Sequence, residues 1–188
     1  MSGSRWHEAL NEHARTIDAL RDAESVLERI RGALAAALRG GRCVYVIGNG
    51  GSAADAQHIA GEMLGRFKRQ RLPIPVIALT TDSSTLTAVA NDLGYELVFA
   101  RQVAALARAG DVLWVLTTSG NSPNLIVAAE AARAAGAAVI GFTGRDGGRL
   151  APLCTHEFRV PHSDSDRIQE AHQLAYHYLC EQLERDWM

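Results

Sequence analysis

The chain has 188 residues, of which 47% are hydrophobic and 21% charged, and this length and composition fit one globular domain. Its 19 Lys and Arg residues against 21 Asp and Glu residues give a formal charge of -2, so no overall field favours nucleic acid or an acidic membrane. The three cysteines form no CxxC pair, the N-terminus lacks the apolar core of a signal peptide, and no run reaches the roughly 18 apolar residues of a membrane span. We therefore expect a cytoplasmic protein with no disulfide framework and no nucleic-acid or membrane partner.

Residues 5–39 have the spacing of one or two amphipathic helices. Apolar side chains recur there at intervals of three, four or seven residues, with charged residues between them: Leu10, Ile17, Leu20, Leu27, Ile30, Leu34 and Leu38. This segment carries more apolar positions than a helix beside a small sandwich should leave exposed, so it predicts a homo-oligomer.

After Gly40 and Gly41 the pattern changes to short apolar runs, each followed by a cluster of Gly, Ser, Thr or Asp. Five runs predict strands, at residues 43–48, 75–80, 112–117, 138–143 and 156–161. Runs without polar alternation suit strands buried on both faces, and strands that alternate with helices suit a parallel sheet. With a last helix over 166–184, the pattern predicts a three-layer α/β/α sandwich with a five-stranded parallel sheet, preceded by the N-terminal helices.

Three polar loops follow three of these strands, at residues 48–52, 117–122 and 143–148. In an open parallel sheet, ligands bind beyond the carboxyl ends of the strands, where helix N-termini present unpaired N–H groups. In the second loop, Ser119 and Ser122 add hydroxyl donors just before Pro123, which is well placed to open a helix. The loop suits a phosphate monoester, and ordinary helix capping is the alternative interpretation.

The first loop also fits the dinucleotide pattern G-x-G-x-x-G/A through Gly48, Gly50 and Ala53. A dinucleotide-binding unit has an acidic residue about 20 positions further on. The acid available here, Asp82, follows Gly48 by 34 residues, and this spacing argues against a nicotinamide dehydrogenase.

Two pairs of polar residues have spacings that can build a site. His58 and Glu62 are four apart, so they share a helix face and can converge on a metal ion or substrate, although a surface pair has the same spacing. Gln169 and His177 are eight apart, which leaves them within roughly 80° of each other around a helix. We interpret the neighbouring Glu170 and His172 as surface or packing residues.

Taken together, the motifs resemble the sugar isomerase (SIS) domain family. The resemblance runs in order over residues 43–180 through GNGGSAADAQHIAGE, the pair Asn91-Asp92, TTSGNS, TGRDGG and VPHSDSDRIQEAHQLAYH. It implies a SIS domain over 40–188, with 1–39 serving oligomerisation. It further implies a homotetramer whose active sites draw on more than one subunit.

The resemblance also implies roles for individual residues. Glu62 and His177 match the catalytic acid/base pair, and one zinc per subunit is implied at His58, Glu62, Gln169 and His177. The implied substrate-binding residues form a larger set: Asn49, Gly50, Gly51, Ser52, Glu62, Arg66, Asn91, Asp92, Thr117, Thr118, Ser119, Ser122, Asp166 and Gln169.

The implied reaction is an aldose–ketose isomerisation through an enediol or enediolate. By resemblance, it converts sedoheptulose 7-phosphate to D-glycero-D-manno-heptose 7-phosphate, the entry to ADP-heptose and the lipopolysaccharide inner core. The main alternative is a non-catalytic relative that binds the replication initiator DnaA and lacks the acid/base pair. A sugar-phosphate sensor fused to a transcription regulator is disfavoured, because we expect no additional DNA-binding domain in this chain.

Overall fold

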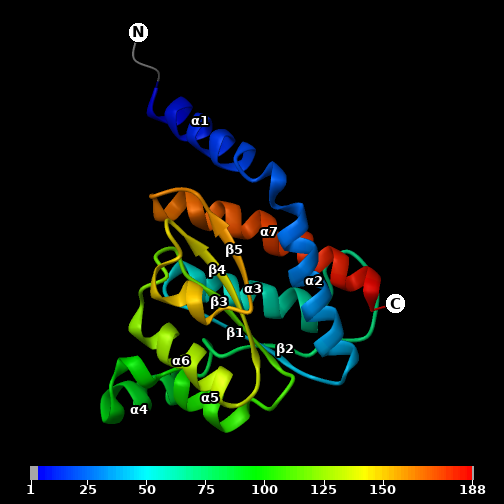
Figure 1. Ribbon diagram of the computed structural model, residues 1–188, viewed down its shortest axis with the longest axis vertical. Coiled ribbons are helices and arrows are strands. Elements are labelled where there is room, and N and C mark those ends of the chain that lie inside the picture. Colours follow the sequence, from blue (N-terminus) through cyan, green and yellow to red (C-terminus); the bar gives the residue numbers. More distant parts are fainter. Residues whose placement is uncertain (1–3, 188) are drawn as a thin grey trace.

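Five parallel strands form one sheet in the order β2-β1-β3-β4-β5 (Figure 1). The computed structural model describes residues 4–187. The strands are β1 (Val44–Gly48), β2 (Val76–Ala78), β3 (Val112–Leu116), β4 (Ala138–Gly144) and β5 (His156–Val160). All five predicted strands are present and the sandwich is confirmed. β2 is shorter than predicted because the chain turns at Leu79 and Thr80, and because Pro75, which has no N–H to donate to the ladder, stands directly before it.

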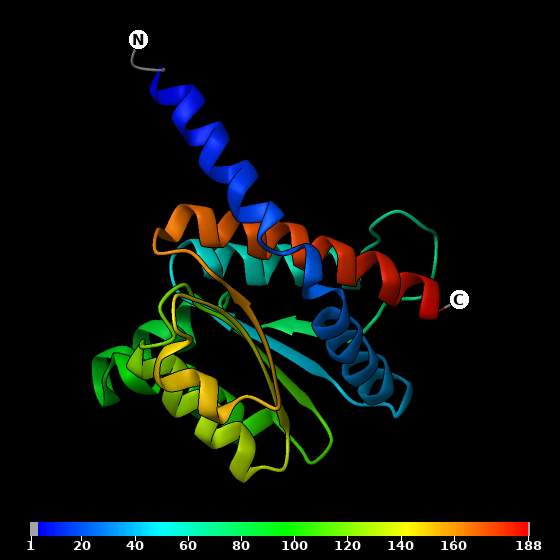
Figure 2. The same cartoon turned by 45° about the horizontal axis from the view of Figure 1, so that its top comes forward.

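Helices cover both faces of the sheet, as the predicted three-layer architecture requires (Figures 1 and 2). On one face, α2, α3 and α7 pack on inward side chains such as Val46 and Trp114, and on the other, α5 and α6 pack on Ile47 and Val115. The helices are α1 (Arg5–Asp18), α2 (Glu24–Arg39), α3 (Gly51–Leu64), α4 (Ser83–Leu93), α5 (Ala100–Leu106), α6 (Pro123–Ala134) and α7 (Ser165–Asp186). Short 3-10 turns lie at Arg21–Ala23, Tyr95–Leu97 and Gly148–Leu153.

The N-terminal helix α1 extends away from the sandwich, as Figure 2 shows. Its apolar residues Trp6 and Leu10 are 68% and 44% exposed. Its contacts with α7 are partly polar: Arg167 donates to the carbonyl of Ala9 at 2.9 Å, and His13 pairs with Glu170 at 2.9 Å. The prediction of one or two helices over 5–39 is thus resolved as two, α1 and α2, joined by a 3-10 turn.

The strand register brings the three polar loops to one edge of the sheet. Gly48 pairs with Leu116, and Leu116 pairs with Phe142, so β1, β3 and β4 end side by side. Their carboxyl ends lead into α3, α6 and the turn before Gly148. Loops that are far apart in the sequence therefore lie next to one another beyond the carboxyl ends of the strands.

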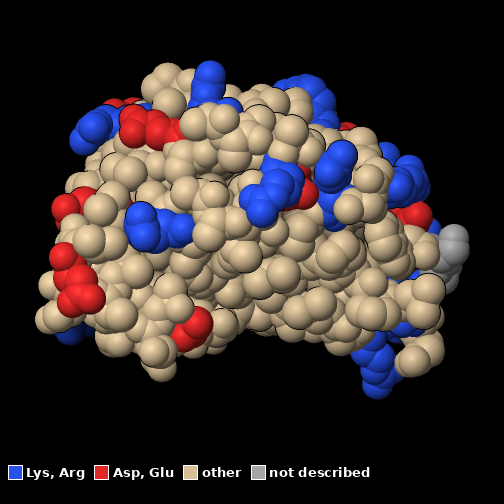
Figure 3. Space-filling view, turned by 90° about the horizontal axis from the view of Figure 1, so that it is seen from below, with Lys and Arg blue, Asp and Glu red and all other residues tan. Residues whose placement is uncertain are grey.

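The face of the molecule formed by α4 and α5 carries charged side chains of both signs. Figure 3 shows Lys and Arg interspersed with Asp and Glu on that face. Within residues 4–187, no helix is long and apolar enough to cross a membrane.

His172 is a fully buried histidine in the core, which confirms that it is a packing residue. Its Nε2 lies 2.9 Å from the carbonyl oxygen of Thr143 and donates to it, while Nδ1 has no partner. Burial lowers the pKa of His172 to about 4, because the charged form is poorly solvated there. A proton added at Nδ1 would place a charge in the core with no acceptor.

We expect His172 to make the fold sensitive to acid. Because its folded pKa lies below its unfolded value, stability is present above the unfolded pKa and is lost as the pH falls from 6.5 to about 4. Between pH 7 and pH 5 the loss should be roughly 2 kcal/mol. Urea unfolding at both pH values would measure it. His172→Gln keeps a donor but removes the titrating group, so an equal pH dependence in this variant would contradict the assignment.

Candidate active site

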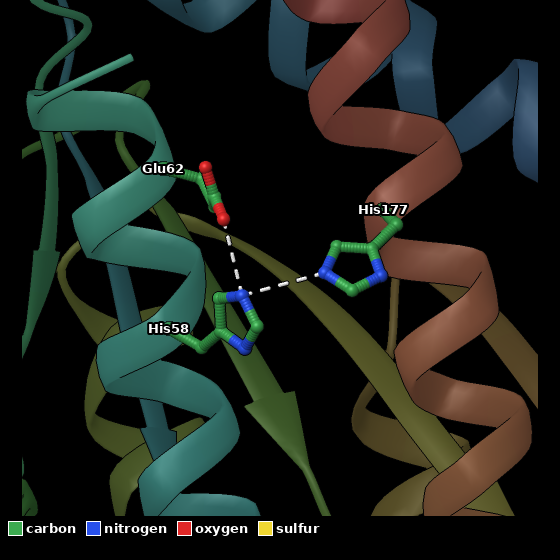
Figure 4. A group of neighbouring side chains, drawn as sticks. All are labelled: His58, Glu62 and His177. Atoms are coloured by element: carbon green, nitrogen blue, oxygen red, sulfur yellow. Dashed lines mark hydrogen bonds and ion pairs between the residues drawn. The ribbon is translucent and has the colours of Figure 1, made fainter. Parts of the chain in front are cut away.

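Three side chains from two helices meet on the face of the sheet covered by α3 and α7 (Figure 4). His58 and Glu62 lie on one face of α3, with His58 Nε2 3.1 Å from Glu62 Oε1. His177 projects from α7 so that its Nε2 lies 3.4 Å from the same His58 nitrogen. The predicted pair on α3 is therefore joined by a group 115 positions along the chain from Glu62, and a surface pair no longer explains it.

The His177 ring is held in a partly apolar setting. The Phe67 ring stacks on it with centroids 5.5 Å apart and an interplanar angle of 8°. Burial, and then the neighbouring His58, lower the pKa of His177 below its ordinary value. Its imidazole is therefore neutral at pH 7, the form that can accept a proton or bind a metal ion.

The three residues fit a metal ion by their donor chemistry. One ligand atom from each of His58, Glu62 and His177 lies within 4.8 Å of the other two. Imidazole nitrogen and carboxylate oxygen are common zinc ligands. The fourth residue implied by resemblance, Gln169, projects from α7 toward α3, where its amide nitrogen donates to Asp55 Oδ2 at 3.1 Å and its amide lies against Gly51.

Gln169 also explains one glycine of the first loop. A Cβ at Gly51 would overlap the Gln169 amide, so a larger residue there would displace that side chain from its place beside the start of α3. The preceding Gly50 has φ 55°, a conformation that L side chains rarely adopt. Gly51 thus leaves room for the Gln169 amide, and Gly50 permits the turn into α3.

The second loop lines a small pocket at the carboxyl edge of the sheet. The pocket has a volume of about 90 Å³ and is lined by Asn49, Ser52, Leu116, Thr117, Thr118, Ser119, Ser122 and Leu125. Ser122 stands at the N-cap of α6, yet its side chain makes no capping hydrogen bond. Its hydroxyl is thus available to a ligand, which favours the phosphate interpretation over ordinary capping at this residue.

Asn49 is fixed by a network that the sequence did not predict. Its amide and that of the buried Asn124 exchange two hydrogen bonds of 2.9 and 2.8 Å, and the Tyr95 hydroxyl donates to Asn49 Oδ1 at 3.1 Å. These three residues border a cavity of about 260 Å³ beside the 90 Å³ pocket. Asn49 contributes to the lining of both.

Other residues implied by resemblance lie outside these contacts. Arg66 is exposed beyond the end of α3. Asn91 donates to Asp92 at 2.7 Å on the exposed end of α4, and Asp166 pairs with its neighbour Arg167 at 3.0 Å. This single chain does not bring them to the His58 cluster.

The acid considered for a dinucleotide has a different role. Asp82 is the N-cap of α4 and accepts from the backbone N–H of Thr85 at 3.0 Å. The structure thus gives it a local function as a helix cap.

Three residues beside the cluster were missed from the sequence: Asp55, Phe67 and Tyr176. A signal was present for Asp55, because it precedes His58 by three residues and Glu62 by seven, and these spacings place all three on one helix face. Tyr176 likewise follows Gln169 by seven residues. Phe67 gave no such signal, since it lies in an irregular loop.

Comparison with known proteins defines the class. Residues 9–144 match the SIS domain family, and the chain belongs to that family. It is 53% identical over 155 residues to the phosphoheptose isomerase of Aquifex aeolicus, covering 82% of this chain and 81% of that one. The chain is accordingly an enzyme, an isomerase of this family.

Two solved structures extend the comparison to the whole fold. A phosphoheptose isomerase from Francisella tularensis has a TM-score of 0.89 at 38% identity, covering 97% of this chain and 95% of that one. The phosphoheptose isomerase of Neisseria gonorrhoeae has a TM-score of 0.86 at 39% identity, with coverages of 97% and 96%.

Proposed function

We propose that the protein is an aldose–ketose isomerase that converts sedoheptulose 7-phosphate to D-glycero-D-manno-heptose 7-phosphate, the first step toward ADP-heptose and the lipopolysaccharide inner core. The observation that carries the proposal is the meeting of Glu62 and His177 around His58, from two separate helices. The names of the relatives support a phosphoheptose as the substrate.

The two halves of the site suit the two ends of such a substrate. Ser52 borders the small pocket at the N-terminus of α3, and His58 follows it by six residues, about 9 Å along the helix axis. A heptulose 7-phosphate carries its phosphate at the end opposite its C1 and C2. The phosphate would lie among the hydroxyls of residues 117–122 while C1 reaches Glu62.

Isomerisation requires a base at C1 and an acid for the oxygen on which charge develops. In our proposal, the Glu62 carboxylate takes a proton from C1 and, after exchange with solvent, delivers a proton to C2. The neutral His177 takes the proton of the C1 hydroxyl and delivers it to the C2 oxygen, so that C1 becomes the aldehyde and C2 the alcohol. Asn49, held by Asn124 and Tyr95, would orient the sugar hydroxyls between the two ends.

Zinc fits the same residues, and we propose one ion per subunit at His58, Glu62, Gln169 and His177. When bound, it would supply Lewis-acid polarisation of the substrate carbonyl. Gln169 would contribute its amide oxygen, since its amide nitrogen is held by Asp55.

Replacement of Ser119 or Ser122 by alanine is expected to weaken substrate binding more than it lowers stability. Each change removes a hydroxyl donor to a charged phosphate, an interaction of about 1.5–3 kcal/mol, so Kd should rise roughly 10- to 100-fold. Calorimetric titration with the substrate would measure the affinity. Ser84→Ala, on exposed α4, is the control. Unchanged affinity in both loop variants would mean that the two hydroxyls serve only the turn and the helix N-terminus and do not bind phosphate.

We also propose that 1–39 serves association into a homotetramer. The support is the projecting α1 with its exposed Trp6 and Leu10. Partner subunits would then bring further residues to each site, which suits the separation of Arg66, Asn91, Asp92 and Asp166 from the cluster. Light scattering at micromolar concentration should give about four times 20.2 kDa, and a mass of 20.2 kDa would contradict the proposal. The unpaired cysteines suit a reducing cytoplasm.

Incubation of the purified protein with sedoheptulose 7-phosphate, followed by NMR for the aldose, tests the proposed function. We expect turnover. Absence of turnover with and without added zinc, together with binding to DnaA, would instead favour the non-catalytic alternative. The presence of both Glu62 and His177 argues against that alternative.

A further inference from the structure

A single buried carboxylate connects two of the residues implicated in metal binding. Asp55 lies on α3 and is 8% exposed. Its Oδ1 accepts from the Tyr176 hydroxyl at 3.2 Å, and its Oδ2 accepts from the Gln169 amide nitrogen at 3.1 Å. Each oxygen of the carboxylate therefore holds one side chain of α7.

The Tyr176 hydroxyl contacts the nitrogen of His58 that faces away from the cluster. It lies 3.2 Å from His58 Nδ1 as well as from Asp55. Nε2 of the same ring lies 3.1 Å from Glu62 Oε1, and because a carboxylate only accepts, Nε2 donates in that contact. A cation bound between Nε2 and Glu62 would replace that hydrogen bond, and the ring would then carry its proton on Nδ1. The phenol proton goes to Asp55, since donation to a carboxylate is the stronger bond, so the phenol oxygen would accept from Nδ1–H and keep the Nε2 lone pair toward the ion.

Asp55 orients the Gln169 amide by the same logic. A carboxylate only accepts hydrogen bonds, so it must face the NH₂ group of that amide. The amide oxygen, which is the atom that binds metal ions, is left free. Asp55 thus presents the ligating atom of Gln169 directly and that of His58 through Tyr176.

We propose that Asp55 and Tyr176 are positioning residues that hold His58 and Gln169 in the orientation required to bind a divalent cation. Neither contributes an atom to the ion. Hydrogen bonds of this kind to a metal ligand typically affect metal affinity 10- to 100-fold. The inference rests on the proposed metal site of the isomerase.

The test is the affinity of purified protein for Zn²⁺, measured by competition with a chromophoric chelator. Tyr176→Phe keeps the ring that packs on His58 and His177 and removes only the hydroxyl. We expect its Zn²⁺ affinity to fall 10- to 100-fold. Asp55→Asn should have at least the same effect, because it disturbs both partners of the carboxylate.

Tyr178→Phe is the matched control. Tyr178 lies two residues further along α7, and its hydroxyl donates to Glu28 Oε1 at 2.8 Å, away from the cluster. The change is chemically the same as at Tyr176, and we expect unchanged Zn²⁺ affinity. Thermal unfolding of the metal-free variants separates loss of fold from loss of orientation. A positioning role should also lower kcat while leaving KM near the wild-type value.

Three results would overturn the inference. The first is a Tyr176→Phe affinity within about threefold of wild type, below the range for such contacts. The second is an equal loss in Tyr178→Phe, and the third is a wild-type protein that binds no Zn²⁺. If Tyr176→Phe does not fold, Asp55→Asn decides under the same criteria. Wild-type protein that binds Zn²⁺ but does not isomerise the sugar would contradict the proposed function only. The Zn²⁺ affinities of the variants would still test the positioning role of Asp55 and Tyr176.

Discussion

Glu62→Gln is expected to lower kcat by about 10⁴-fold, because an amide cannot take the proton from C1. General bases contribute about 10²- to 10⁴-fold, and the loss of a base that the reaction requires should fall at the upper end. The change keeps the size of the side chain and leaves an oxygen beside His58. The variant therefore tests the loss of the basic carboxylate without a change in side-chain size and with a possible metal-binding oxygen still in place. Turnover of sedoheptulose 7-phosphate, followed by NMR, would measure it.

Glu130→Gln is the control for this change, since Glu130 is exposed on α6, on the opposite face of the sheet. The Glu62→Gln protein should retain the wild-type unfolding temperature and its affinity for the phosphate end of the substrate. Near-normal turnover in Glu62→Gln would mean that Glu62 is not the base, and His177 would become the candidate.

The largest effect on stability is expected at Glu184, which is fully buried and ties α7 to the loop after α3. Its carboxylate accepts from the backbone N–H groups of Phe67, Lys68 and Arg69 at 2.8–3.2 Å and forms an ion pair with Arg71 at 3.2 Å. Burial alone raises the pKa of Glu184, but these hydrogen bonds and the charge of Arg71 overcome it and hold the pKa below its ordinary value.

Glu184→Gln should reduce the free energy of unfolding by about 3–5 kcal/mol, because it leaves the buried guanidinium of Arg71 without a counter-charge. Urea denaturation would measure the loss. Glu181→Gln is a matched control on the same helix: its ion pair with Lys68 lies at the surface and should contribute about 0–1 kcal/mol. Equal effects of the two changes would contradict the role given to Glu184.

The same loop links stability to the site. Arg71 donates to the carbonyl of Glu62 at 2.7 Å and to that of Met63 at 2.8 Å, so it caps the end of the helix that carries the base. Glu184 holds the backbone of Phe67, whose ring stacks on His177. Destabilisation at Glu184 should therefore also disturb the acid/base pair.

The fold could be predicted from the sequence because its three central strands, β1, β3 and β4, are buried on both faces and its helices are amphipathic. Both patterns are local, and they located all five strands and α7 to within about three residues. The edge strand β2 was overestimated mainly because the chain already turns at Leu79 and Thr80. The positions of His58 and Glu62 on one helix face also followed from local spacing.

The partners of these residues could not be predicted in the same way. Whether His177 reaches His58 depends on how α7 packs across α3, and no spacing within either helix encodes that packing. In the sequence, Glu184 cannot be distinguished from the other polar residues of its helix, although it is buried and accepts hydrogen bonds from three backbone N–H groups. Long-range packing of this kind is decided by the tertiary fold.

Proton transfer at C1 of a heptulose phosphate leaves an isotopic record when the reaction runs in heavy water. Wild-type protein is incubated with sedoheptulose 7-phosphate in D₂O, and the aldose product is analysed by NMR at partial conversion. We predict D-glycero-D-manno-heptose 7-phosphate with deuterium at C2, because an enediol exchanges its proton with solvent. Product without deuterium at C2, and residual ketose without deuterium at C1, would contradict proton transfer through Glu62, and absence of any product would contradict the isomerase itself.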